Sequence, residues 1–178
     1  MASMTFAELR AAFEGITGVT DDVSDQLAVW FNEAQMDLSN DFGKVVKDIS
    51  GTYADVTSGS EYALPDRFFN IVQCSCDYSL TPDGKIVFAD GGEVTLYYRQ
   101  IPTMFVASKP DTLCELDERV HQLIPMFAAA RYWDMESEGD YEESGHGTKW
   151  MNYYLQGKAR SKRAFETWNN NIDRWVVE

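Results

Sequence analysis

The strongest polar pair in the 178-residue chain is Asp117 with His121. Residues four apart on a helix share one face, where the carboxylate can orient the imidazole as a general base. A small hydrolase that uses this pair is one interpretation; the other is an ordinary surface contact, which has the same spacing and is far more common. The sequence lacks the common nucleophile, phosphate-loop, zinc-protease and dinucleotide motifs. We therefore expect a protein that is not an enzyme and needs no cofactor.

The cysteines indicate neither a disulfide framework nor a metal site. Cys74 and Cys76 lie two apart in an expected strand and so point to the same face, while Cys114 stands apart from them. An odd number of cysteines without paired spacing favours a reducing compartment. Neither His121 nor His146 stands at a spacing that completes a set of metal ligands. We expect ordinary thiols and no bound metal.

Charged side chains gather in two groups on a predicted helical hairpin. An acidic group lies near its tip, and a basic group lies far along its second helix. Two solvated faces explain this pattern, and so does an interface between copies. In the second interpretation, the acidic patch of one copy meets the basic patch of the next and repetition closes a ring. The inter-subunit candidates are Glu136, Glu138, Glu142, Glu143, Lys158, Arg160, Lys162 and Arg163.

The hairpin is predicted over residues 116–168, where apolar residues recur at helical spacing in both halves. If its turn lies near residue 142, paired positions sum to about 285, which places Ala128 beside Gly157. Small residues on both sides predict a close approach of the two helices. Alternatively, Gly157 ends the second helix as a C-cap. Pro125 predicts either a kink or a separate first turn. The candidates for hairpin packing are Ala128, Gly157 and Ser161.

Two helices and a β part precede the hairpin. Thr5 and Glu8 form a capping box for a helix that stops at Gly15, and a second helix ends near Asn40. Between 45 and 101, β-branched and aromatic runs predict a meander of three or four antiparallel strands, too small to hold a core alone. We therefore predict a mainly α fold with a small antiparallel β part: a helical bundle of about four helices, with a long C-terminal helical hairpin and an inserted β-meander.

We expect a single domain over residues 1–178. Its parts are N-terminal helices at 5–40, a β-meander insertion at 45–101, the hairpin at 116–168 and a tail at 169–178. The tail ends in an apolar tip that either folds back on its own core or contacts a partner. The candidates for a partner contact are Ile172, Trp175, Val176 and Val177.

The composition narrows the class of partner. The formal net charge is −14, with a pI near 4.4. Such a chain repels nucleic acid and anionic membranes, so we expect no DNA binding driven by phosphate contacts, although an acidic wall can surround DNA without gripping it. No apolar run approaches the roughly 20 residues that a membrane helix needs. We expect a soluble protein made inside the cell.

Three stretches carry a resemblance to a known family. EYALPDRFFNIVQ is a leucine-proline entry into a strand, and EVTLYYRQIP is a strand with paired tyrosines before a proline. LDERVHQLIPMFAAARYWDMESEGD is an alanine-rich helix that runs into acidic residues, and a second helix with a basic end follows. In this order, over residues 20–170, the sequence resembles the head-to-tail adaptor (connector or head-completion) proteins of tailed bacteriophages.

The resemblance implies a structural virion protein of the neck, assembled in the host cytoplasm as a homo-oligomeric ring of about twelve copies. Such a ring attaches to the portal protein, extends the DNA channel and docks a stopper or tail protein. Double-stranded DNA would pass through it without sequence-specific binding, and no membrane would be involved. The apolar tail tip would contact the portal. A stopper or tail-terminator protein is the alternative within virion proteins, and Pro125 departs from the family's continuous hairpin helix.

Overall fold

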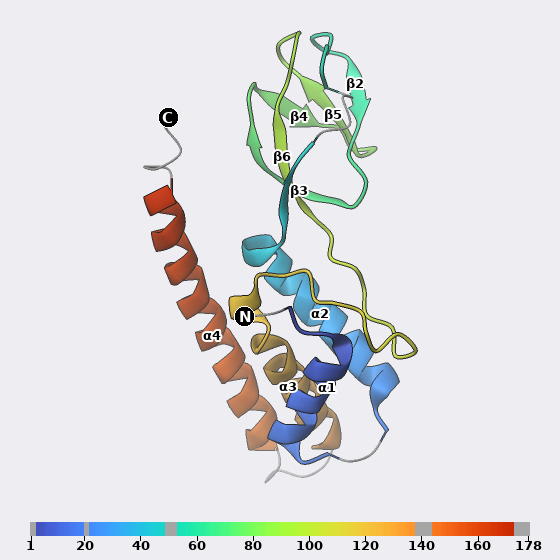
Figure 1. Ribbon diagram of the computed structural model, residues 1–178, viewed down its shortest axis with the longest axis vertical. Coiled ribbons are helices and arrows are strands. Elements are labelled where there is room, and N and C mark those ends of the chain that lie inside the picture. The colour runs from blue at the N-terminus through green and yellow to red at the C-terminus, as the bar shows by residue number, and fades with distance from the viewer. Residues whose placement is uncertain (1–2, 20–21, 49–52, 138–143, 173–178) are drawn as a thin grey trace. The chain divides into compact units, whose positions relative to one another are not determined.

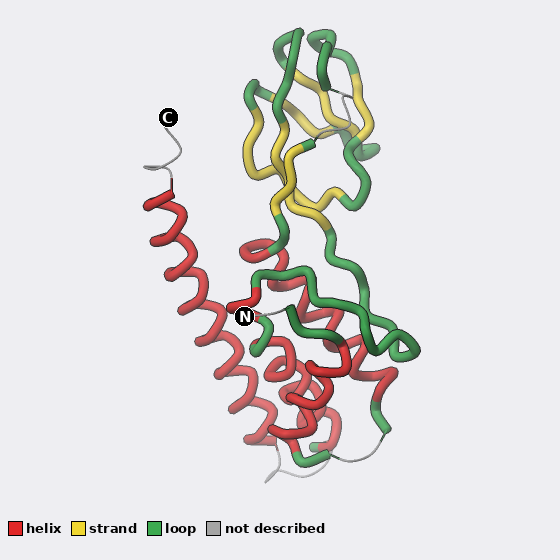
Figure 2. The backbone as a smooth tube through the Cα atoms, in the orientation of Figure 1, coloured by secondary structure: helices red, strands yellow, loops and turns green. Residues whose placement is uncertain are grey.

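The chain folds into two units whose sequences differ in periodicity. The computed structural model describes residues 3–19, 22–48, 53–137 and 144–172, with the backbone alone at 144 and 165–172. Within this part, one unit comprises residues up to Phe42 and from Thr103 onward, and the other comprises Gly43–Pro102. We call them the helical unit and the β unit; all named strands belong to the second (Figures 1 and 2).

The first helix of the helical unit begins where its capping box predicts. The Glu8 N–H donates to Thr5 Oγ1 (3.2 Å) and the Thr5 N–H donates to Glu8 Oε2 (2.7 Å). The predicted end at Gly15 is wrong, because the helix continues to Gly18, whose φ of 73° ends it. The described helices of this unit are α1 (Phe6–Thr17), α2 (Ser24–Phe42), α3 (Leu123–Glu136) and α4 (Ser144–Ile172), with a short 3-10 turn, η1 (Glu118–Val120).

Pro125 does not kink the hairpin. It lies in the first turn of α3, where a missing N–H breaks no bond within the helix. The residues before it form the separate turn η1, which confirms that alternative of the sequence prediction. Asp117 caps η1 by accepting a hydrogen bond from the Arg119 N–H (3.0 Å).

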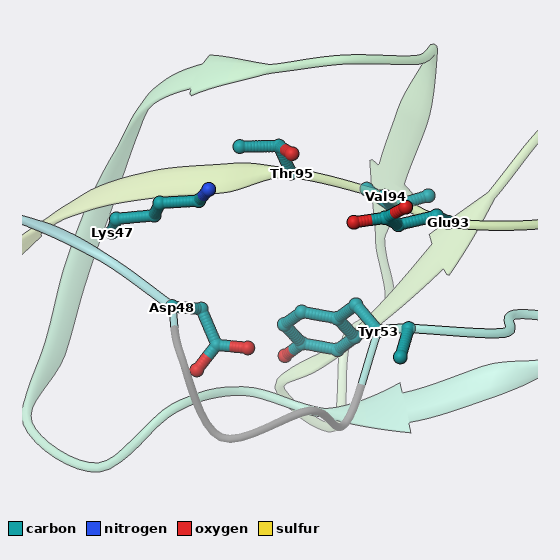
Figure 3. Close-up of a pocket in the computed structure, with 7 residues that line it drawn as sticks. Lys47, Asp48, Tyr53, Glu93, Val94 and Thr95 are labelled. Atoms are coloured by element: carbon teal, nitrogen blue, oxygen red, sulfur yellow. The ribbon is translucent and has the colours of Figure 1, made fainter.

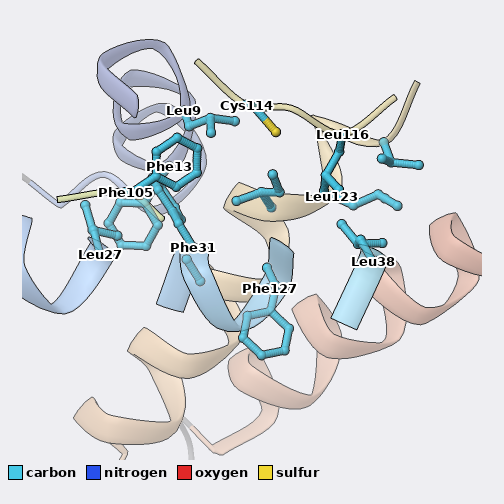
Figure 4. Packing of buried hydrophobic residues seen from close by; sticks show 14 of the residues in the cluster. Leu9, Phe13, Leu27, Phe31, Leu38, Phe105, Cys114, Leu116, Leu123 and Phe127 are labelled. Atoms are coloured by element: carbon cyan, nitrogen blue, oxygen red, sulfur yellow. The ribbon is translucent and has the colours of Figure 1, made fainter. Parts of the chain in front are cut away.

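Aromatic and aliphatic side chains from all four helices fill one core in the helical unit. Phe31 of α2 meets the ring of Phe6 edge-on, with centroids 5.6 Å apart, and Phe105 from the segment after the β unit packs against both. The alanine run of α3 is wholly buried in this core. Labelled members of the cluster are Leu9, Phe13, Leu27, Phe31, Leu38, Phe105, Cys114, Leu116, Leu123 and Phe127 (Figure 4).

The β unit contains two three-stranded antiparallel sheets rather than one meander. One has the strand order β1-β6-β3 and the other β2-β5-β4, with no closed barrel in the described residues. The chain leaves the first sheet after Cys74, bends at Ser75 and enters the second sheet at Tyr78. The strands are β1 (Val45–Lys47), β2 (Glu61–Ala63), β3 (Phe68–Cys74), β4 (Tyr78–Leu80), β5 (Lys85–Phe88) and β6 (Leu96–Gln100).

This arrangement corrects the predicted fold class. The described chain is a mixed fold of four α-helices and two antiparallel sheets, so the prediction of a mainly α fold with a small β-meander is wrong. The prediction that the β part cannot hold its own core is also wrong, because apolar side chains of both sheets bury each other. These buried residues are Tyr53, Val56, Ile86, Phe88, Val94 and Leu96.

Candidate interaction surface

The register of the hairpin fixes which side chains of α4 face the core. Phe127 of α3 meets Tyr154 of α4, and Trp133, later in α3, meets His146, earlier in α4; ring centroids are 5.2 Å apart in both pairs. The two helices therefore run antiparallel. Gly157 lies against Leu123, so the predicted pairing of Gly157 with Ala128 is wrong. The cause is that α3 ends at Glu136, which places the connection earlier in the chain than the predicted turn.

Two glycines let α4 approach α3 closely. A Cβ atom on Gly157 would overlap Leu123 Cδ2. A Cβ atom on Gly147 would overlap the Asp134 carboxylate and lie 3.2 Å from the Ala130 carbonyl oxygen. Gly157 is not a C-cap, because α4 continues to Ile172. Ser161, the third residue predicted for hairpin packing, is half-buried, and Ala128 is fully buried.

A row of ion pairs joins α2 to the hairpin. Three carboxylates stand four residues apart along α2 and therefore share one face. Each meets a cation from α3 or α4, so Lys158 and Lys162, two of the candidates for contact with a second copy, form ion pairs within the chain. The row consists of Glu33 with Arg131 (3.3 Å), Asp37 with Lys158 (2.8 Å) and Asp41 with Lys162 (2.8 Å).

The middle pair is reinforced by a buried phenol. The Tyr154 hydroxyl donates to Asp37 Oδ2, and Lys158 donates to the same oxygen and to the Asp37 carbonyl oxygen (3.1 Å). Burial raises the pKa of Tyr154, and the bond to the carboxylate raises it further. Partial burial raises the pKa of Asp37, but the bonds from Lys158 and Tyr154 outweigh it, so the net shift is downward. The phenol therefore stays protonated and the carboxylate stays ionised at neutral pH.

Sequence reasoning placed Tyr154 on the seam of the hairpin but missed Asp37 and its contact with the Tyr154 hydroxyl. A signal was present, because carboxylates four apart on α2 match Lys158 and Lys162, which are four apart on α4. The match can be recognised only once α2 and α4 are known to be neighbours.

The side of α4 that faces away from Tyr154 is exposed. Tyr153 and Leu155 are 45% and 52% exposed, and the Lys149 ammonium lies 5.9 Å from the Tyr153 ring centroid. Residues 144–165 contain no acidic side chain, although the whole chain carries a net charge of −14. This surface is therefore a basic patch with apolar members. We call it the outer face of α4 and define it by Lys149, Asn152, Tyr153, Leu155, Gln156, Arg160 and Arg163, all exposed.

The remaining interface candidates of the sequence analysis divide into described and undescribed positions. Glu136 is exposed at the end of α3. Two basic candidates, Arg160 and Arg163, belong to the outer face of α4. The side chains of seven candidates lie outside the described residues: Glu138, Glu142, Glu143, Ile172, Trp175, Val176 and Val177.

Asp117 and His121 do not form a base and its orienting carboxylate. His121 is 1% exposed; its Nε2 lies 3.0 Å from the Leu116 carbonyl oxygen, and its Nδ1 accepts a hydrogen bond from the Met4 N–H (3.2 Å). The Asp117 carboxylate instead accepts both guanidinium bonds of Arg119, at 2.7 and 2.9 Å. These bonds lower the pKa of Asp117. The histidine therefore ties the N-terminal segment to the loop before η1.

A small pocket of about 180 Å³ lies in the β unit (Figure 3). The Tyr53 hydroxyl is already used there, because it donates to the Ala63 carbonyl oxygen (2.6 Å). Burial, together with the charge of Asp48, raises the pKa of Tyr53 to about 12, so its phenol cannot serve as a base at neutral pH. The pocket lining combines the ammonium group of Lys47 with the carboxylates of Asp48 and Glu93, so it forms neither a purely cationic nor a purely anionic binding site.

Across the described ranges, no helix combines the length and the apolar character needed to cross a membrane. The same ranges bring together no group of three or more His, Cys, Asp or Glu side chains that could hold a metal ion. No family model and no curated protein sequence matches this chain.

Proposed function

We propose that this protein is a ring-forming head-to-tail adaptor in the neck of a tailed bacteriophage. In this role it attaches to the portal protein, extends the DNA channel and docks the next neck or tail protein. The observation that carries the proposal is the outer face of α4, an exposed patch that is basic and partly apolar on a chain with a net charge of −14. The resemblance of the three sequence stretches specifies which kind of assembly is meant.

Opposite charge on separate surfaces favours contact between different patches of identical copies. Such a contact is head-to-tail, and it closes into a ring when the rotation between copies permits. Charge complementarity guides the encounter, and the apolar members of the patch supply burial once the copies meet. Tyr153 and Leu155 are suited to this, because both are half-exposed on a well-formed helix.

The ion-pair row narrows the predicted interface. Lys158 and Lys162 already bind carboxylates of α2, so they hold the hairpin in place instead of binding a neighbour. Arg160 is the basic residue of the outer face that we place at the interface, with Glu136 as the described acidic candidate. We therefore propose that Arg160 meets the acidic end of α3 in the next copy.

The acidic charge elsewhere suits a channel for DNA. A polyanion is not captured by a wall of the same sign, so it can slide during packaging and ejection. The proposal therefore requires that the purified ring bind free double-stranded DNA weakly, even at low salt.

Mass photometry and negative-stain microscopy test the assembly, with the protein alone and with the portal protein encoded by the same genome. Arg160→Glu should raise the protein concentration needed for half-assembly by about tenfold or more, a change equivalent to about 1.4 kcal/mol. Lys109→Glu, a charge reversal at an exposed loop residue, is the matched control and should assemble normally. Adding Glu136→Lys to Arg160→Glu should restore assembly if these two residues meet across the interface.

Only monomers, both with and without portal protein, would overturn the proposal. Binding to a preformed adaptor ring instead of the portal would identify a stopper.

A further inference from the structure

Two thiols lie where the chain crosses between the sheets of the β unit. Cys74 ends β3, and Cys76 follows the bend that leads to β4. The bend is fixed by Ser75, whose N–H donates to the Thr95 carbonyl oxygen (3.0 Å) and whose hydroxyl accepts from the Thr95 N–H (2.9 Å). Both cysteines are therefore held by a defined backbone.

The two side chains point to the same side of the chain. Cys74 and Cys76 are half-buried and pack against the same apolar cluster of the β unit, while Ser75 between them is exposed. Burial raises the pKa of Cys76, and the neighbouring Cys74 raises it further through its charge and a hydrogen bond. The Cys74 thiol is thus close enough to affect the ionisation of Cys76.

The backbone is compatible with a bond between them. A disulfide spans Cα atoms about 4.4–6.8 Å apart. Residues two apart in a fully extended strand are separated by roughly 6.6–6.8 Å, at the upper end of that range. Ser75 and Cys76 lie in a bend, so the chain is not fully extended there.

We propose that Cys74 and Cys76 are a reversible dithiol–disulfide pair that is oxidised by small-molecule disulfides. One thiolate attacks oxidised glutathione, forms a mixed disulfide and releases one glutathione thiolate. The second cysteine then attacks the protein sulfur of the mixed disulfide, closes the Cys74–Cys76 bond and expels a second glutathione thiolate. The two protons lost by the cysteines go to the two glutathiones, so two thiols and one disulfide become one new disulfide and two thiols.

The bond is expected to be labile. It closes a very short loop and so removes little entropy from the unfolded chain. A bond with little stabilisation is readily reduced by excess thiol. Its consequence is local, because it fixes one bend at which the chain crosses between the two sheets. This inference does not depend on the proposed function.

Cys114 provides an internal comparison. It is 1% exposed in the core of the helical unit, and burial raises its pKa to about 11. It should stay reduced under conditions that oxidise the pair.

The test equilibrates the full chain with excess oxidised glutathione, alkylates the remaining thiols and measures the intact mass. The number of thiols that can be alkylated in the denatured chain should fall from three to one. Apart from the alkyl groups, the mass of the chain should fall by two hydrogen atoms, with no glutathione retained. Peptide mapping of the wild-type protein should place the bond between Cys74 and Cys76. Cys74→Ser and Cys76→Ser should each retain one glutathione, and Cys114→Ser should still close the bond. Three thiols, a stable wild-type glutathione adduct or a bond between chains would each overturn the proposal.

Discussion

Gly157→Ala tests the observed register of the hairpin. The added Cβ overlaps Leu123 Cδ2, and Leu123 is buried, so it cannot swing into solvent. Overpacking of this kind costs about 1–3 kcal/mol. Alanine regains roughly 0.8–1 kcal/mol of helix propensity relative to glycine. The net effect on the free energy of unfolding is therefore a loss of about 0–2 kcal/mol.

Gly15→Ala is the matched control. Gly15 lies within α1, and a Cβ there has no neighbour within 4 Å, so the variant shows the propensity gain alone and should be stabilised by about 0.5–1 kcal/mol. The difference between the two variants, about 1–3 kcal/mol, isolates the overlap.

Tryptophan fluorescence during urea unfolding is the appropriate assay. All five tryptophans lie outside residues 43–102, so the signal reports on the helical unit and not on the β unit. In the double variants, Leu123→Ala should relieve the cost of Gly157→Ala, whereas Ala128→Gly should not. If Gly157→Ala stabilised the protein as much as Gly15→Ala, or if relief came from residue 128, the register described above would be incorrect.

Three further results are expected. Tyr154→Phe removes the hydroxyl that donates to Asp37 and should lower the free energy of unfolding by about 0.5–1.5 kcal/mol at pH 7, measured by the same urea titration. The pKa of Asp37 is lowered in the folded state, so its bonds to Lys158 and Tyr154 stabilise the fold fully above the unfolded pKa of about 3.9. This stabilisation is lost as the pH falls through the folded-state pKa. The difference in the free energy of unfolding between wild type and Tyr154→Phe should therefore shrink in acid. A difference that stayed constant down to acid unfolding would contradict this. His121→Ala leaves the Met4 N–H without its partner, so hydrogen exchange at that amide should accelerate while assembly persists. Loss of assembly with unchanged exchange would contradict the role of His121 in holding the N-terminal segment.

Local chemistry made parts of the fold predictable. The Thr5 and Glu8 capping box specifies the start of α1, because both of its hydrogen bonds are made within one turn. Pro125 marks the start of α3, because proline fits a first turn and not a helix interior. The seam of small residues predicts that the hairpin helices pack closely.

Features that depend on distant partners were not predictable. One of the crossings between the two sheets is a bend at Ser75, which contains neither glycine nor proline and is held by Thr95. Likewise, Lys158 resembled a residue for a second copy because its partner, Asp37, is 121 positions away. Periodicity specifies the faces of an element, but it does not specify which other element covers them.

The antiparallel pair β1 and β6 has a consequence for how the chain tolerates change. Val45 pairs with Arg99, and the Gln100 N–H donates to the Lys44 carbonyl oxygen (3.1 Å), so the two ends of the β unit are held together close to where it joins the helical unit. Because the ends of this insertion are held side by side, closing it as a loop of the helical unit costs about as much conformational entropy as closing a short turn, whatever the length of the insertion. Homologous chains should therefore vary most in the size of this insertion, and a short glycine-rich linker from Phe42 to Thr103 should replace it without unfolding the helical core.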